Sequence, residues 1–201
     1  MSTWPLLSWA AAWHPTSGRA LEPVEADTSV SNKDVDGVTR HSFAAMALNE
    51  IGFHSCTPCG ILRLLDAYEI GPTHQADAVV VGRSPIPGKP VKMLLPARNA
   101  TSTYCHSHIR DLADHVREAH IAIAAVGRPE TIRGEWIKDG AVAIDSGCNP
   151  GNVDYTGAAA RARLLSPVPC RVGPMTIAVL LSRPSQRSPQ TTLSSCNDLA
   201  R

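Results

Sequence analysis

The chain has 201 residues, which is enough for one complete domain, or for one domain and part of another. Its 19 basic and 18 acidic residues are interleaved and leave a formal net charge of +1, which argues against nucleic acid or an anionic membrane surface as a partner. The longest apolar runs have the length of strands and are too short to span a bilayer.

The two ends of the chain differ in composition from the middle. Residues 1–31 lack sustained periodicity and contain several prolines, so we expect a poorly ordered segment, without the basic region of a secretory signal peptide. Residues 183–201 are rich in Ser, Thr, Gln and Pro, and we expect a disordered tail. Six cysteines are scattered along the chain, which favours reduced thiols in a cytoplasmic protein over a disulfide framework.

Between these ends, helical and strand-like patterns alternate. Two helices are predicted first, over Ser42–Gly52 and Gly60–Tyr68, with a connecting segment at Phe53–Pro58. Strand-like runs and further helices follow at Asp77–Val81, Gly88–Arg98, Ala100–Cys105, Asp111–Ala119, His120–Val126, Ala141–Asp145, Leu164–Val168 and Gly173–Leu181. This alternation predicts an α/β fold with a parallel sheet and with a ligand beyond the carboxyl ends of its strands.

The first predicted strand ends in a polar turn that is flanked by glycines. The turn begins with Gly82, Arg83 and Ser84, and a helix opens at Gly88. A strand that passes through such a turn into a helix is typical of a phosphate-binding loop, so these four residues are candidates for binding a dinucleotide.

The end of the second predicted strand indicates which dinucleotide is bound. An NAD-binding unit normally carries an acid here for the ribose 2′-hydroxyl, whereas this chain has Tyr104–His108. No carboxylate in that segment would repel a 2′-phosphate. Arg83 and Ser107 can instead bind one, so the residues themselves favour NADP.

Two cysteines in CxxC spacing, Cys56 and Cys59, raise the question of a metal. Together with Cys105, His106 and His108 they could be assembled into a zinc site. We expect no metal, because adjacent residues at a strand end point their side chains to opposite faces. A redox dithiol of thioredoxin type is not favoured either, since it requires a strand-to-helix junction in a sheet of a different order.

Two other segments have both a structural and a functional interpretation. Lys33–Gly37 carries two carboxylates on a turn, which is usually a solvated loop, although one carboxylate can accept two parallel hydrogen bonds from the amino-pyrimidine edge of a pterin. Pro167–Thr176 is a stiff turn that opens a helix. It can serve as a helix cap or lie against a flat ring.

Several motifs follow one another in a fixed order over residues 32–182. They are Lys33–Gly37, Cys56–Pro58 with Gly60, Val80–Ser84 with Gly88 and Pro90, Asn99–Thr101, Cys105–Ser107, Gly134–Lys138, Ala141–Asp145 with Gly147 and Asn149, and Pro167–Pro169 with Val172–Thr176. In this order they resemble the bifunctional methylenetetrahydrofolate dehydrogenase/methenyltetrahydrofolate cyclohydrolase family.

The resemblance implies a Rossmann-type NADP-binding domain, with helices on both faces of its sheet, over residues 69–182. It also implies a remnant of an N-terminal folate-binding α/β domain, with linking helices, over residues 32–68. The implied reaction is the NADP-dependent oxidation of 5,10-methylenetetrahydrofolate to 5,10-methenyltetrahydrofolate, which the family then hydrolyses. Carried over by position, the cofactor phosphates would be bound by Arg83, Ser84 and Ser107, the pterin by Asp36, and the cofactor or cleft would lie near Thr57, Gly173 and Thr176.

The chain also departs from the family pattern. The family's Tyr-x-x-x-Lys helix and Gln-Leu-Pro segment precede the lysine motif, and this chain has neither, so no catalytic residue is assigned. Pro87 replaces a valine, Cys170-Arg171 replaces Gly-Gly, and Asn152 replaces an acid. We expect a truncated, partly degenerate member with dehydrogenase activity and an impaired cyclohydrolase, able to form a homodimer through the NADP domain. The alternative is a non-catalytic NADP-binding module or an inactive homologue.

Overall fold

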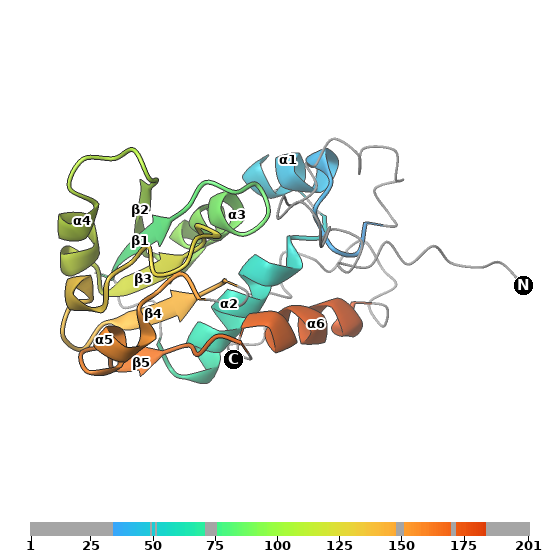
Figure 1. Ribbon diagram of the computed structural model, residues 1–201. Coiled ribbons are helices and arrows are strands. Elements are labelled where there is room, and N and C mark those ends of the chain that lie inside the picture. The colour runs from blue at the N-terminus through green and yellow to red at the C-terminus, as the bar shows by residue number, and fades with distance from the viewer. Residues whose placement is uncertain are drawn as a thin grey trace, which may run out of the picture.

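The computed structural model describes residues 34–48, 50, 52–70, 76–147, 151–169 and 172–183 (Figure 1). The N-terminal segment 1–31 and residues 184–201 of the predicted tail lie outside these ranges, so the disorder expected for them stays a prediction. No helix within the described ranges is both long enough and apolar enough to cross a membrane.

A single parallel sheet forms the centre of the described structure. Its strand order is β2-β1-β3-β4-β5, with β1 (Asp77–Val81), β2 (Thr101–Cys105), β3 (Ile121–Ala124), β4 (Val142–Asp145) and β5 (Leu164–Leu165). Every neighbouring pair is parallel. The chain passes from β1 to β2 on one side and then crosses to β3 on the other, so the direction of winding reverses beside β1. This topology confirms the predicted Rossmann-type α/β fold.

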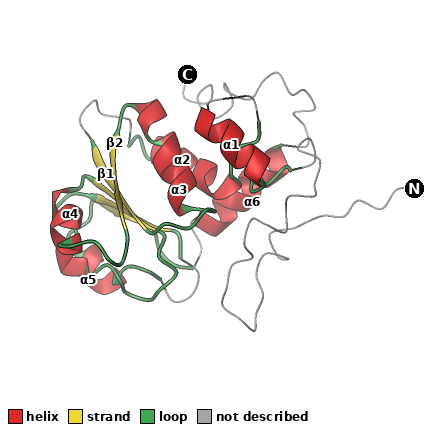
Figure 2. Cartoon of the chain, turned by 90° about the horizontal axis from the view of Figure 1, so that it is seen from above, coloured by secondary structure: helices red, strands yellow, loops and turns green. Residues whose placement is uncertain are grey.

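Helices cover both faces of the sheet, as Figure 2 shows. One face carries α2 (Cys56–Ala67), α3 (Gly88–Leu94) and α6 (Val172–Ser182), with α1 (Arg40–Leu48) beyond them. The other face carries α4 (Leu112–Glu118) and α5 (Tyr155–Ala159). Two short 3₁₀ helices, η4 (Pro96–Arg98) and η5 (Gly134–Trp136), complete the described elements.

The two cores explain why the central strands β1, β3 and β4 are mostly apolar, whereas β2, at one end of the strand order, has exposed polar residues. Ala78 and Val80 of β1 face the core beneath α2 and α3, whereas Val79 and Val81 face the core beneath α4 and α5. Strands that are buried on both faces have few positions for polar side chains. The strand-like runs in the sequence therefore match the observed strands, and β1 has the predicted bounds.

Some element bounds differ from those expected from the sequence. The predicted connection over Phe53–Pro58 is wrong in its second half, because α2 begins at Cys56. Pro58 is tolerated in the first helical turn, where its missing N–H has no partner to lose. The predicted helix Gly88–Arg98 ends at Leu94 and is followed by η4, and the sequence patterns did not predict the short α5 at all.

At the end of β1, the backbone leaves no room for a side chain. Gly82 has a φ of +121°, and a Cβ atom there would lie 2.0 Å from the carbonyl oxygen of Ala125. The N–H of Gly82 donates to the carbonyl of Cys105 over 2.9 Å, and the N–H of Ala125 donates to that of Val81 over 2.7 Å. The end of β1 is thus fixed by both of its neighbours, and only glycine fits there.

We expect Gly82→Ala to lower the free energy of unfolding by more than about 2 kcal/mol, because it combines backbone strain with a steric clash. Gly140→Ala is the matched control: Gly140 has a φ of +79°, but a Cβ there would meet nothing within 4 Å. The control should lose only about 1 kcal/mol, from strain alone. Urea denaturation measures both variants, and equal losses would contradict this account of Gly82.

Candidate functional site

The turn that follows β1 is closed by its own backbone. A Cβ atom on Gly88 would lie 2.3 Å from the carbonyl oxygen of Gly82, so α3 begins directly against the turn. The Ser84 hydroxyl accepts a hydrogen bond from the N–H of Ile86 over 3.2 Å, and its carbonyl accepts one from Lys89 over 2.9 Å. A hydroxyl that accepts one bond still has a hydrogen to donate, so Ser84 remains a candidate phosphate ligand.

Arg83 and Ser107 follow two strands that are paired in the sheet. The last residues of these strands, Val81 and Cys105, are register partners. Both Arg83 and Ser107 are exposed. Burial raises the pKa of Tyr104 in β2, and the charge of Arg83 opposes that rise, so the guanidinium lies within electrostatic range of β2. The structure therefore brings these two predicted residues to the same edge of the sheet.

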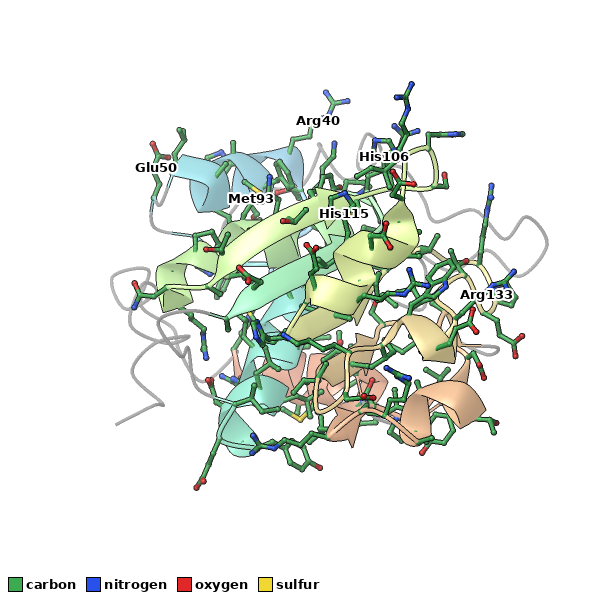
Figure 3. The ribbon with its side chains drawn as sticks, turned by 90° about the vertical axis from the view of Figure 1, so that its left-hand side faces the viewer. Arg40, Glu50, Met93, His106, His115 and Arg133 are labelled. Atoms are coloured by element: carbon green, nitrogen blue, oxygen red, sulfur yellow. The ribbon has the colours of Figure 1, made fainter. Side chains whose placement is uncertain are left out.

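The segment after β2 adds imidazole groups to this edge (Figure 3). The N–H of His108 donates to Nδ1 of His106 over 3.1 Å, and the two ring centroids are 6.1 Å apart. Residues 82–88 and 106–110 contain no Asp or Glu. An anionic group at this edge would therefore meet basic and neutral side chains from both segments.

Thr57 and Thr176 come together from distant parts of the chain. Thr176 in α6 is buried, and its hydroxyl donates to the carbonyl of Val172 over 2.9 Å and lies 3.3 Å from the hydroxyl of Thr57 in α2. Gly60 lets the helices approach, since a Cβ there would lie 3.2 Å from the backbone N of Thr176. A Cβ on Gly173 would meet nothing within 4 Å, so the first turn of α6 is open on that side.

The turn before α1 contains one carboxylate whose two oxygens both accept hydrogen bonds from the chain itself. Asp34 is buried, and its oxygens accept five hydrogen bonds of 2.5–3.2 Å, from the backbone N–H groups of Gly37, Val38 and Thr39 and from the hydroxyls of Thr39 and Ser42. These bonds shape the turn and cap the approach to α1. Asp34 is therefore a structural carboxylate.

Asp36, the predicted pterin ligand, has different surroundings. Its side chain is half-buried. Burial raises the pKa of Asp36, and the charge of Asp34 raises it further, whereas the charge of Arg183 and a hydrogen bond from Cys56 lower it. Of the two carboxylates, Asp36 is the one that can face a ligand.

Residues 55–190 match the family model described as tetrahydrofolate dehydrogenase/cyclohydrolase, NAD(P)-binding domain. The chain belongs to the tetrahydrofolate dehydrogenase/cyclohydrolase family. A curated relative, bifunctional protein FolD 1 of Salinispora arenicola, is 57% identical over 173 residues, which are 85% of this chain and 62% of the relative. More than a third of that relative therefore has no counterpart in the match.

Solved structures of the same family share the fold. The bifunctional enzyme FolD, a methylenetetrahydrofolate dehydrogenase/cyclohydrolase from Campylobacter jejuni, has a TM-score of 0.78 and 34% identity, over 83% of this chain and 61% of that one. The FolD enzyme of Trypanosoma brucei, solved with NADP cofactor and inhibitor, has a TM-score of 0.76 and 30% identity, over 87% and 64% of the two chains. The domain boundary predicted at residue 69 stays a prediction.

Asp145 is a polar residue of this family member that the sequence motifs did not assign to the site. It ends β4 and is 3% exposed. Its carboxylate accepts hydrogen bonds from the N–H of Gly147 over 2.7 Å, the N–H of Val153 over 2.9 Å and the side-chain amide of Asn152 over 2.8 Å. Burial raises the pKa of Asp145, and these hydrogen bonds oppose the rise. The sequence did carry one signal that could have identified Asp145 as a candidate: it is a carboxylate at the end of an otherwise apolar strand.

Asn152, where the family pattern has an acid, completes this buried network. Its side chain is 1% exposed. The amide nitrogen also donates to the carbonyl of Ala124 over 3.3 Å, and the amide oxygen accepts from the N–H of Arg128 over 3.2 Å. A carboxylate would have no hydrogen to donate to Asp145. The substitution therefore suits the neighbouring buried carboxylate and joins the ends of β3 and β4.

The cysteines considered for zinc are separated in the fold. Cys56 and Cys59 are buried in the first turn of α2, and Cys105 is buried at the end of β2, where burial raises its pKa. Over the described ranges, no group of three or more His, Cys, Asp or Glu side chains is arranged to hold a metal ion. The absence of bound zinc stays a prediction.

We expect Asn152→Asp to cost about 3 kcal/mol of unfolding free energy at pH 7.5, because it places a second, unpaired carboxylate against Asp145. The loss should shrink at pH 5.5, since two close carboxylates can share a proton. Asn99→Asp makes the same chemical change at an exposed position and should have little effect. Urea denaturation at both pH values tests this, and a loss independent of pH would argue against the carboxylate pair.

Proposed function

We propose that this chain binds NADP at the carboxyl edge of its sheet. The observation that carries the proposal is the glycine turn at Gly82, from which Arg83 projects at the edge that Ser107 also reaches. Gly88 also supports this proposal, because the start of α3 lies directly against the turn, as in a phosphate-binding loop, with no side chain between them. The relative from Trypanosoma brucei was solved with NADP, which supports the same cofactor here.

The choice of NADP over NAD follows from charge. Arg83 can form a charge-assisted hydrogen bond to a 2′-phosphate, and Ser107 can donate a further one. Residues 106–110, which follow β2, contain no carboxylate that would repel that phosphate. Ser84 would bind a phosphate of the same cofactor, while Thr57, Thr176 and the open backbone at Gly173 would border its ring.

We propose a tetrahydrofolate derivative as the second ligand, with Asp36 accepting hydrogen bonds from its pterin. The reaction is the oxidation of 5,10-methylenetetrahydrofolate to 5,10-methenyltetrahydrofolate, in which NADP takes up the hydride that leaves the methylene carbon. The chain's residues contribute mainly by holding the two reactants in place, which alone can lower a barrier substantially. In the proposed complex, the nicotinamide ring of NADP would lie near Gly173 and would face the pterin.

Hydrolysis of the methenyl product makes a different demand, because it needs groups that activate water and move a proton. None of the three tyrosines, Tyr68, Tyr104 and Tyr155, is followed by a lysine four residues later. This favours an impaired cyclohydrolase, and it also supports the second candidate function, a non-catalytic NADP-binding module.

We also propose a cytoplasmic location and a homodimer. Buried thiols at Cys56, Cys59 and Cys105 suit a reducing compartment. Strand β2 lies at one end of the strand order, so its outer side is an edge at which a second copy could pair.

We expect the chain to bind NADPH more tightly than NADH, by about tenfold or more, because only NADPH offers a 2′-phosphate to Arg83 and Ser107. Arg83→Ala should weaken NADPH binding while leaving NADH binding nearly unchanged. The control is Arg117→Ala, since Arg117 lies in the last turn of α4, away from the carboxyl edge, in an exposed ion pair with Asp114. Fluorescence titration measures all the affinities, and equal binding of the two nucleotides by the unmodified chain would refute the NADP assignment.

We expect slow, methylenetetrahydrofolate-dependent formation of NADPH and no hydrolysis of methenyltetrahydrofolate above the uncatalysed rate. The two reactions are followed by the absorbance of NADPH and of the methenyl compound. Asp36→Asn should reduce NADPH formation without changing NADPH affinity. NADPH binding with no NADPH formation would favour the non-catalytic module, and fast hydrolysis would show that other residues replace the missing Tyr-x-x-x-Lys helix.

A further inference from the structure

Arg183 lies directly after α6, yet its side chain is only 8% exposed. An arginine is rarely buried to this extent, because its charge must be compensated by hydrogen bonds or by other charges. The residue falls at the start of the segment that we expected to be a disordered tail. Its burial therefore calls for a structural or functional reason.

The guanidinium of Arg183 joins two segments that lie on either side of α1. It donates one hydrogen bond to the carbonyl oxygen of Val35 and another to that of His54. Its central carbon lies 5.4 Å from the centre of the Phe53 ring, and one of its nitrogens lies 3.9 Å from the sulfur of Cys59. The end of α6 is thereby linked to the first turn of α2 and to both flanks of α1.

These two segments also pack directly on each other. A Cβ atom on Gly37 would lie 2.4 Å from the carbonyl oxygen of His54, and the N–H of Cys56 donates to the carbonyl of Asp36 over 3.1 Å. The backbone at Asp36 is therefore fixed by two contacts: the packing of the next residue, Gly37, against His54, and the hydrogen bond from Cys56. The guanidinium of Arg183 joins the same two segments through its hydrogen bonds to the carbonyls of Val35 and His54.

Arg183 also affects the charge of Asp36. The charged and titratable groups that act on this carboxyl come from each neighbouring segment: Asp34 in the same turn, Cys56 in α2 and Arg183 after α6. Burial and Asp34 favour the protonated form, and among the residues that the structure describes Arg183 contributes an opposing positive charge. A carboxylate must be ionised to accept two hydrogen bonds from an amino-pyrimidine edge.

We infer that Arg183 is a positioning residue for Asp36: by joining the Val35 and His54 carbonyls, with its permanent charge within electrostatic range of the carboxylate, it sets the geometry of the Asp36 turn for an amino-pyrimidine ligand. This inference rests on the proposed role of Asp36 in folate binding. It adds a function for the end of α6 that lies outside the cofactor edge.

The test uses Arg183→Met, which keeps bulk and removes the charge and the two hydrogen bonds. We expect the pKa of Asp36 to rise in this variant, as measured by a carbon-13 NMR titration of its carboxyl group. Tetrahydrofolate should bind about tenfold more weakly at pH 7, because a charged partner of the binding carboxylate is lost. NADPH affinity, which reports on the intact cofactor edge, should not change.

Two further variants separate positioning from general stability. Arg183→Lys keeps the charge but loses the planar fork, so the pKa of Asp36 should stay close to that of the unmodified chain while tetrahydrofolate affinity is only partly restored. Amide hydrogen exchange over residues 35–38 should be faster in Arg183→Lys. Arg117→Met removes an exposed arginine and should change none of these quantities.

The outcomes are distinguishable. If Arg183→Met binds NADPH normally and the pKa of Asp36 does not change, the inference is wrong. If Arg183→Met loses NADPH binding because it does not fold, Arg183→Lys decides, and unchanged exchange over residues 35–38 overturns the inference. If the unmodified chain does not bind tetrahydrofolate, the proposed folate function fails, whereas the Asp36 titration still decides whether Arg183 controls this carboxyl.

Discussion

The contact between the backbone of Gly82 and the carbonyl of Ala125 constrains everything at the carboxyl edge of the sheet. No side chain fits at Gly82, and backbone hydrogen bonds with Cys105 and Ala125 hold the end of β1 between the ends of β2 and β3. Arg83 and Ser84 follow in the same rigid turn, and α3 starts against the same residue. The positions of the candidate cofactor residues therefore depend on a backbone contact more than on the side chains themselves.

Apolar and buried polar groups have separate tasks in this fold. The two apolar cores hold helices on both faces of the sheet, but they do not determine where the loops run. The loops are placed by carboxylates and one arginine that are buried and hydrogen-bonded: Asp34 before α1, Asp145 at the end of β4 and Arg183 after α6. Because such groups are costly to bury without partners, each one requires a particular loop conformation.

The sequence predicted β1, β3 and β4 because strands buried on both faces are mostly apolar runs. It also predicted that Arg83 and Ser107 lie at one edge, because the carboxyl ends of strands meet when they pair in parallel. Their role in binding a cofactor stays a prediction. The same reasoning could not predict Arg183, because its partner Val35 is 148 residues away and no local pattern links the two. Asp145 and Asn152 were also missed as a pair, since their roles appear only when the loop after β4 folds back. The short α5 lacks the length at which helical periodicity becomes visible.

The contact between α2 and α6 has a consequence for the order in which the chain can fold. Thr57 and Thr176 are 119 residues apart, and all five strands lie between them. Bringing two such distant segments together carries a large entropic cost, which is offset only once the intervening sheet exists. A ribosome releases α2 before the five strands of the described sheet and α6 after them. During synthesis, the part of α2 that packs on α6 therefore lacks this cover until α6 has emerged.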